Sequence, residues 1–414
     1  MLHHHFDIDF RLPSAMALMA VLGVLSTYTF ALYGRLIHKT QARSLGELWE
    51  SISGKGSSWI VGLCSLVFGL GATLSYSILV CDVFQTLATA LGGSGLLITK
   101  PFWVLVMTLG AIIPLCSMKD LNKLAPVSAV GVTGIMSTSL FLAWRCPFIN
   151  PQSPYAAGGA LLSTLTASQI PAFGTIAKGF GSPSSMVLGG MAASAYLGHF
   201  AAPDFYHAVK RTDSSSSEGS ESRSVKTMRD FFKVTIASFS TVIFINCLMM
   251  AFGFLTFGGN SDGIILNNFS AMDPFATVCR LLMSISVLGG YPFIISACRG
   301  EASELYKRKT KKEATPSVQK KINLSMLAGI ASLALVLKSA GFVIGFNGAL
   351  MGSAIVYIFP CLLFLSATSE VAPRSRRLSF ERLFCKFLVG FGVFASATGA
   401  VVSVLDQYFP SLLV

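Results

Sequence analysis

The sequence predicts an all-α membrane protein with ten transmembrane helices. Of its 414 residues, 53% are hydrophobic and 12% are charged, whereas a soluble domain carries about 25% charged residues. The apolar residues are gathered in segments close to the length of about 20 residues that an α-helix needs to cross the hydrocarbon core. Because no soluble core could bury so much apolar surface, we expect the lipid bilayer to surround the chain.

Ten apolar segments meet or approach the spanning length. They cover residues 14 to 34, 58 to 91, 101 to 118, 125 to 144, 184 to 207, 233 to 257, 274 to 297, 322 to 338, 341 to 366 and 385 to 408. The second segment is unusually long, because 34 residues at about 1.5 Å each exceed a hydrocarbon core of about 30 Å. We therefore expect it to tilt strongly or to bend near Gly92.

The basic residues predict the orientation. The formal net charge is +12, and 25 of the 31 Lys and Arg residues lie in the loops after the first, third, fifth, seventh and ninth segments. These loops should be cytoplasmic and face an anionic membrane surface, so nucleic acid is not an expected partner. Both termini then lie on the other side. A short extracytoplasmic start without a preceding helix indicates that one helix is missing from the front of the sequence as given.

The fifth segment should be interrupted at membrane depth. Gly198 and Pro203 bracket His199, and a proline without an N–H leaves an upstream helix carbonyl without its partner. In lipid, such a vacancy is tolerated only where the backbone lines a cavity or is buried in protein. Interrupted helices form the substrate site of many secondary transporters. A titratable ring inside the break favours that reading over a kink that serves packing alone.

A few polar side chains inside the other segments are candidates for ion or substrate contacts. Asp82 follows Tyr76 by six residues in the second segment, where its carboxylate could bind a cation or a substrate amine, or cap the helix rim. Ser284 and Ser286 could offer oxygen ligands to a small cation, although serine also serves helix packing. Arg280 should extend to the outer surface and act as an anchor.

Two loop features accompany the segments. Residues 212–224 are rich in serine and should form a flexible cytoplasmic linker. Asn268-Phe-Ser270 is a glycosylation sequon on the side predicted to be extracytoplasmic. We find no metal-binding, nucleotide-binding or hydrolase motif, and the nine cysteines form no C-x-x-C pair. We therefore expect neither an enzyme nor a cofactor or metal site.

Five stretches in a fixed order resemble one family. The G-H-F-A-A-P sequence of residues 198 to 203 is similar to G-H-A-V-F-P in that family's sixth helix. Leu25 to Arg35 is similar to its second helix, and Pro114 to Leu124 with Ser128 is similar to the junction of its fourth and fifth helices. Ala251 to Gly258 with Ile265 to Phe269 is similar to its seventh helix and the next loop, and Tyr291-Pro292 to the end of its eighth helix. The family is the amino acid/auxin permease family, which includes vacuolar, vesicular and sodium-coupled neutral amino acid transporters.

The resemblance implies a five-plus-five inverted-repeat fold of the leucine-transporter type across residues 1–414. The first repeat would be 14–145, the second repeat 183–366, and 385–408 an appended last helix. Members of the family begin with a broken first helix that carries a G-x-G-I-L-x-x-P-like motif. This sequence has no such segment, so ten of the usual eleven helices are expected.

The resemblance also implies ion-coupled transport of amino acids, by symport or antiport and by alternating access. The coupling ion would be H+ or Na+, and the partners would be a small amino acid and the bilayer, with no obligate protein partner. The expected substrate contacts are Tyr76, Tyr196, Gly198, His199, Phe200 and Pro203, and the expected ion-coupling residues are Asp82, His199, Ser284 and Ser286.

Two other functions stay open at this point. One is an amino acid sensor or receptor that signals without transport, and the other is a regulatory truncated form that assembles with an intact relative. The sequence does not decide which amino acid is bound or whether the home is a vacuolar, endomembrane or plasma membrane.

Overall fold

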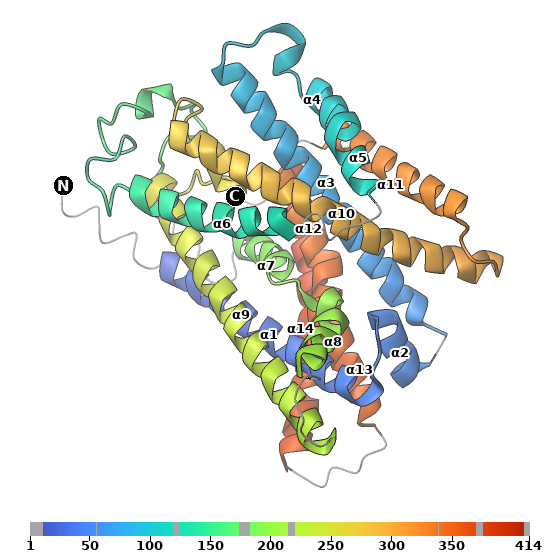
Figure 1. The fold of residues 1–414 in the computed structure, drawn as a ribbon. Coiled ribbons are helices and arrows are strands. Elements are labelled where there is room, and N and C mark those ends of the chain that lie inside the picture. The colour runs from blue at the N-terminus through green and yellow to red at the C-terminus, as the bar shows by residue number, and fades with distance from the viewer. Residues whose placement is uncertain are drawn as a thin grey trace. The chain divides into compact units, whose positions relative to one another are not determined.

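The structure is a computed structural model that describes residues 11–54, 56–118, 125–173, 183–213, 220–337, 339–369 and 376–409. Within these ranges the chain is helical (Figure 1), and its one extended contact is an isolated bridge between Ala172 and Gly258. The prediction of an all-α protein is confirmed.

The helices follow the predicted segments closely. In chain order they are α1 (Arg11–Thr40), α2 (Leu45–Ser53), α3 (Ser58–Ala90), α4 (Lys100–Met107), α5 (Ile113–Cys116), α6 (Ala125–Arg145), α7 (Pro183–Ala195), α8 (Ala202–Asp213), α9 (Ser220–Phe257), α10 (Pro274–Thr310), α11 (Pro316–Val336), α12 (Ala340–Asn347), α13 (Phe359–Ala367) and α14 (Arg376–Tyr408). A π-helical turn, η3 (Thr108–Ile112), joins α4 to α5. Two more, η8 (Gly348–Gly352) and η9 (Ala354–Ile358), join α12 to α13.

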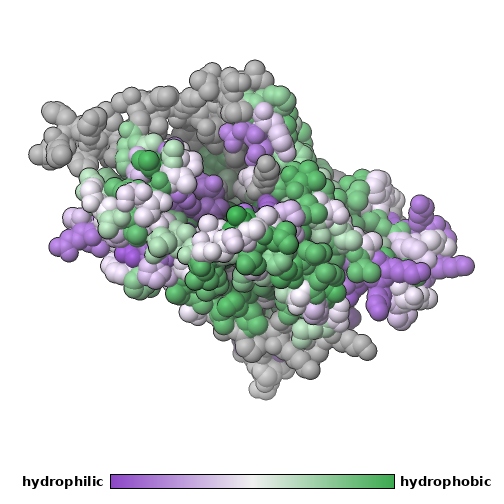
Figure 2. All heavy atoms as spheres, turned by 90° about the horizontal axis from the view of Figure 1, so that it is seen from above, coloured by the Kyte–Doolittle hydropathy of each residue, from purple (hydrophilic) through white to green (hydrophobic). Residues whose placement is uncertain are grey.

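Six helices in the described ranges are long and apolar enough to cross a membrane. They are Leu12–Thr40, Ser58–Ala90, Val225–Phe257, Pro274–Thr310, Ala340–Ala367 and Arg376–Tyr408. Lys100–Cys116 is a shorter apolar helix, and the predicted fifth segment is divided. Apolar side chains cover much of the face drawn in Figure 2, as contact with lipid requires. The protein is therefore a multi-pass integral membrane protein, and the count of ten spans stays a prediction.

The described residues divide into two compact units, each built from segments far apart in the sequence. The first unit takes Met1–Met16, Gly69–Gly179 and Ile245–Ile344. The second takes Ala17–Phe68, Phe180–Phe244 and Gly345–Val414. Four of their five boundaries fall within α1, α3, α9 and α12, so these helices contribute to both. The two repeats that the resemblance implies divide the chain differently from these units, and they stay a prediction.

The first unit has an aliphatic core and an aromatic core. α6 packs along α10 (Figure 1), and the aliphatic core includes Leu74, Ile78 and Ile295. Inside it the hydroxyls of Tyr291 and Ser77 are 3.0 Å apart and satisfy each other. The aromatic core includes Phe141, Tyr155, Phe257 and Phe269, whose rings meet edge to face or tilted.

The second unit depends on a close approach of two backbones. An ideal Cβ added to Gly348 of η8 would lie 2.0 Å from the carbonyl oxygen of Gly190 in α7. Only a glycine fits there, and the contact holds α7 against the π-helical segment. The far end of α7 leads directly into the interrupted part of the chain.

Three features depart from the sequence-based expectations. α10 continues through Pro292 to Thr310, well past residue 297 where the apolar segment ends. The short helix α2 was not predicted; it buries Leu45 and Leu48 and begins with Ser44, whose side chain accepts a hydrogen bond from the backbone N–H of Glu47. Of the expected linker 212–224, residues 214–219 lie outside the described part, and α9 already begins at Ser220.

Candidate functional site

The predicted break in the fifth segment is present. α7 ends at Ala195, residues 197 and 198 are not helical, a single 3₁₀ turn covers His199–Ala201, and α8 begins at Ala202. Pro203 therefore lies in the first turn of α8, where a missing N–H leaves no helix bond unmade. Pro203 starts the second half-helix rather than kinking a continuous one.

His199 is fully buried between the two half-helices, at 0% exposure. Its Nε2 lies 3.1 Å from the carbonyl oxygen of Ser26 and 3.0 Å from the hydroxyl oxygen of Thr29. Because a carbonyl oxygen only accepts, Nε2 must carry the hydrogen. The Thr29 hydroxyl donates to the carbonyl of Leu25 or Ser26, each at 3.1 Å, and so it can accept from the ring.

This arrangement fixes the tautomer of His199 by its partners. In the neutral ring Nδ1 then carries a lone pair, and this buried nitrogen has no hydrogen-bond partner among the described residues. Three aromatic rings surround it edge to face, those of Phe30, Tyr33 and Phe239, with centroids 5.5, 6.0 and 6.1 Å away. A buried acceptor without a donor is unfavourable, so Nδ1 has the capacity for one further hydrogen bond.

A cavity of about 310 Å³ lies beside the break, within the range of small-molecule sites. Its lining includes Tyr196 and Gly198 from the break and no charged side chain. Four phenylalanines are part of the apolar wall, namely Phe30, Phe205, Phe231 and Phe239. A Cβ added to Gly198 would meet only Phe30, at 3.9 Å. Gly198 therefore leaves the cavity open, and its backbone (φ −112°) does not demand a glycine.

The remaining expected substrate contacts in the second unit differ in exposure. Tyr196 is buried at the end of α7, Pro203 is buried in α8, and Phe200 is 41% exposed. Tyr196 faces the cavity, whereas Phe200 and Pro203 are not among its lining residues.

The other expected site residues belong to the first unit. Tyr76 packs against the aliphatic core. Asp82 pairs with Lys100, whose Nζ is 3.5 Å from its Oδ1, so an ammonium already neutralises the carboxylate. Ser284 is buried and its hydroxyl has no hydrogen-bond partner within the described ranges. Ser286 lies against Gly131 of α6, where an added Cβ would be 2.7 Å from its Oγ.

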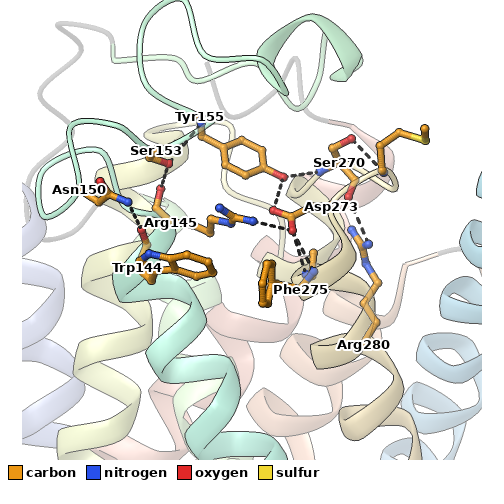
Figure 3. Close-up of polar contacts among 11 residues, drawn as sticks. Trp144, Arg145, Asn150, Ser153, Tyr155, Ser270, Asp273, Phe275 and Arg280 are labelled. Carbon is orange, nitrogen blue, oxygen red and sulfur yellow. Dashed lines mark hydrogen bonds and ion pairs between the residues drawn. The ribbon is translucent and has the colours of Figure 1, made fainter.

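Sequence reasoning missed a polar cluster in the first unit, drawn in Figure 3. Nη2 of Arg145, at the end of α6, donates to Oδ1 of Asp273 at 2.9 Å, and the hydroxyl of Tyr155 donates to Oδ2 at 3.3 Å. Asp273 also accepts from the backbone N–H of Phe275 and so caps α10. Burial, together with the nearby Asp273 carboxylate, raises the pKa of Tyr155 well above its usual value, so this hydroxyl stays a donor at neutral pH.

Arg280 does not extend to the surface as expected. It is 4% exposed, and its guanidinium turns toward the loop before α10 (Figure 3). Nη2 donates to the carbonyls of Leu266 and Phe269 at 2.8 and 2.6 Å, and Nη1 donates to that of Ser270 at 3.4 Å. The local sequence gave no signal for this, because the acceptors are backbone atoms of a loop.

The asparagine of the sequon, Asn268, forms hydrogen bonds inside the fold. Asn268 is 1% exposed; its side chain accepts from the backbone N–H of Asp262 at 2.6 Å and donates to the carbonyl of Asn260 at 2.7 Å. The amide nitrogen that would carry a glycan is therefore inside the fold. The interpretation of this sequence as a glycan site is wrong for the folded protein.

Comparison with known proteins adds independent evidence. The "Putative sodium-coupled neutral amino acid transporter 11" of Danio rerio is 21% identical over 398 residues, which cover 95% of this chain and 80% of that protein. The "Solute carrier family 38 member 10" of Mus musculus is 27% identical over 192 residues, 44% of this chain and 16% of that protein. "Solute carrier family 38 member 8" of Homo sapiens is 23% identical over 180 residues, 41% of each.

A family model described as "Transmembrane amino acid transporter protein" matches residues 12–404. That match covers nearly the whole chain, including the interrupted helix and both units. It confirms the resemblance and the expectation of a transporter rather than an enzyme. The chain belongs to the transmembrane amino acid transporter family.

Proposed function

We propose that the protein is a secondary active amino acid transporter that works by alternating access. The observation that carries the proposal is the interrupted helix, with a cavity beside Gly198, in a chain of this family. A broken helix leaves backbone groups free, and in lipid such groups need either protein or a polar ligand. The amino and carboxylate groups of an amino acid are such ligands.

The cavity indicates the kind of side chain that is carried. No charged residue lines it, and its phenylalanines offer apolar contact. A charged substrate side chain would be buried there without a partner, which costs roughly several kcal/mol of binding free energy. The proposed substrate is therefore a neutral amino acid, which agrees with the name of the Danio rerio relative.

The proposed substrate contacts are Tyr76, Tyr196, Gly198, His199, Phe200 and Pro203. Tyr196 and Gly198 line the cavity directly. His199 contributes through the unpartnered acceptor at Nδ1. Pro203 maintains the break by starting α8.

The coupling ion would be H+ or Na+. The buried hydroxyl of Ser284, which lacks a partner in the described structure, is suited to a small cation, with Ser286 two residues further along α10. His199 is the candidate for a proton. Asp82 would act only if its pair with Lys100 opens.

The proposed architecture is the five-plus-five repeat. In the described residues the second repeat holds α7 with α8, then α9, α10, α11 and α12 with α13, which are five helical segments in the required order. α14 follows as the appended helix.

Uptake by the purified full chain in proteoliposomes tests the proposal. A labelled neutral amino acid is supplied with an imposed Na+ gradient, a proton gradient, or neither, and accumulation is expected with one gradient. Gly198→Trp should abolish uptake, because its side chain enters the cavity. The control Gly390→Trp lies at an exposed site of α14 where an added Cβ meets nothing within 4 Å, and it should keep uptake. Equal uptake by both variants would refute the proposed site.

A further inference from the structure

The polar cluster of the first unit contains a buried positive charge that its one carboxylate does not balance. The cluster of Figure 3 holds two guanidinium groups, those of Arg145 and Arg280, and one carboxylate, that of Asp273. Arg145 forms the ion pair with Asp273. Arg280 is 4% exposed and forms no ion pair among the described residues. Buried charges are normally paired, so a bound anion would stabilise the remaining positive charge.

A small cavity adjoins Arg280. It is about 10 Å³, room for the centre of one water-sized particle, and its walls come from the end of α3 and the start of α10. Its polar lining side chains are Thr86, Thr277 and Arg280; the rest is apolar. A cavity of this size admits a water or a monatomic ion but no polyatomic anion.

The two threonine hydroxyls are available as donors. A helical threonine commonly donates to the carbonyl four residues earlier, as Thr89 does to Gln85 at 3.0 Å. Thr86 and Thr277 make no such bond, nor any other through the side chain, within the described part of the chain. Thr86, Thr277 and Arg280 thus border the same small space, and each of the three side chains can donate hydrogen bonds.

We propose that this cavity binds a chloride ion, held by the hydroxyls of Thr86 and Thr277 and by the charge of Arg280. The positive charge excludes metal cations, and the volume excludes larger anions such as phosphate or carboxylate compounds. The site lies at the ends of α3 and α10 that the basic residues predict to be extracytoplasmic, so the ion would come from that side. This inference does not depend on the proposed transport function.

Chloride-dependent stability of the purified full chain tests the site. Chloride is replaced by gluconate at constant Na+, and the apparent melting temperature is followed as chloride is added back. A ligand that binds the folded state raises the melting temperature in a saturable manner. Binding of radioactive ³⁶Cl⁻ provides a second, direct measurement.

The decisive variants are Thr86→Val and Thr277→Val, which keep side-chain shape and remove the donors. Each lost hydrogen bond to an ion should weaken chloride binding about tenfold. Thr89→Val is the matched control, because Thr89 is exposed on the same helix and bonds its own backbone; it should bind chloride like the unaltered protein. No chloride effect in the unaltered protein, or the same effect in the double valine variant, would overturn the site and leave a water molecule as its occupant.

Discussion

The guanidinium of Arg145 and the carboxylate of Asp273 meet at 2.9 Å although 128 residues separate them in the sequence. The carboxylate is completely buried, and the guanidinium lies over the rings of Trp144 and Phe275, 4.4 and 5.3 Å from their centroids. The pair joins the end of α6 to the start of α10. Three types of contact therefore converge on one point: an ion pair, a helix cap and cation–π packing.

Removal of the carboxylate should destabilise the protein strongly. Asp273→Asn keeps a side chain that can cap α10 but leaves Arg145 buried without its counter-charge. Breaking a buried pair from one side costs about 3–5 kcal/mol. We expect a large fall in the apparent melting temperature of the purified protein, measured by the loss of folded monomer on heating.

A second substitution should restore part of this loss. Arg145→Met in the Asp273→Asn background removes the uncompensated charge while it keeps apolar contact with Trp144. Lys307→Ala, which breaks the exposed pair with Glu313, should leave the melting temperature unchanged. If the double variant is no more stable than Asp273→Asn, the charge balance is not what holds this cluster together.

Thr29 should orient the ring of His199. Thr29→Val removes one of the two acceptors of the Nε2 hydrogen, and Ser26 alone then holds the ring. One hydrogen bond is worth about 1 kcal/mol, so uptake should fall by roughly fivefold. Thr29→Ser keeps the hydroxyl and should keep uptake, which proteoliposome assays measure.

Thr27→Val provides the control for Thr29. Thr27 lies two residues away on α1, and its hydroxyl bonds the carbonyl of Gly23 rather than the ring. Its replacement should leave uptake intact. Equal losses for Thr27→Val and Thr29→Val would show a general effect on α1 instead of an effect on His199.

Gly348→Ala should prevent correct packing of α7 against η8. The added methyl group would lie 2.0 Å from the carbonyl oxygen of Gly190 and 2.3 Å from Oγ of Ser194, so the backbones must separate. We expect loss of monodisperse protein in size-exclusion chromatography. Gly390→Ala, at an open site of α14, should elute as the unaltered protein does; a normal profile for both variants would contradict the close approach.

Asn268 should matter for stability and not for glycosylation. Its two hydrogen bonds tie residues 260 to 268 together. Treatment with a glycosidase should leave the electrophoretic mobility of protein from a eukaryotic host unchanged, because the side chain is buried. Asn268→Asp should lower the melting temperature, since the carboxylate cannot donate to the carbonyl of Asn260. A glycosidase-sensitive mobility shift that the substitution removes would contradict the buried position.

The positions of the helices could largely be predicted from the sequence, because helices that contact lipid consist of apolar residues. The segment 58 to 91 corresponds to α3 (Ser58–Ala90), and 125 to 144 to α6. Apolar composition does not predict where a helix continues beyond the membrane into water. This explains why α10 extends to Thr310 and why α2 was missed.

The candidate site was predictable only where local chemistry dictated it. Gly198 and Pro203 predicted the break, because glycine frees the backbone conformation and proline removes a backbone N–H within the same short segment. The partners of Asp82 and Asp273 were not predictable, since Lys100 and Arg145 reach them through the tertiary fold. Arg280 was misjudged for the same reason, because loop carbonyls, and not water, receive its hydrogen bonds.

The π-helical turns η8 and η9 have a consequence for how relatives of this protein can differ in length. A π turn holds one more residue than an α turn, with hydrogen bonds from i to i+5. Deletion of one residue there would convert the turn to ordinary α-helix, and the residues beyond it would keep their angular positions because the wider turn had absorbed the extra residue. Such a deletion in η8 would therefore leave Tyr357 facing Ser26, and the two hydroxyls, which are 3.5 Å apart, could stay in contact.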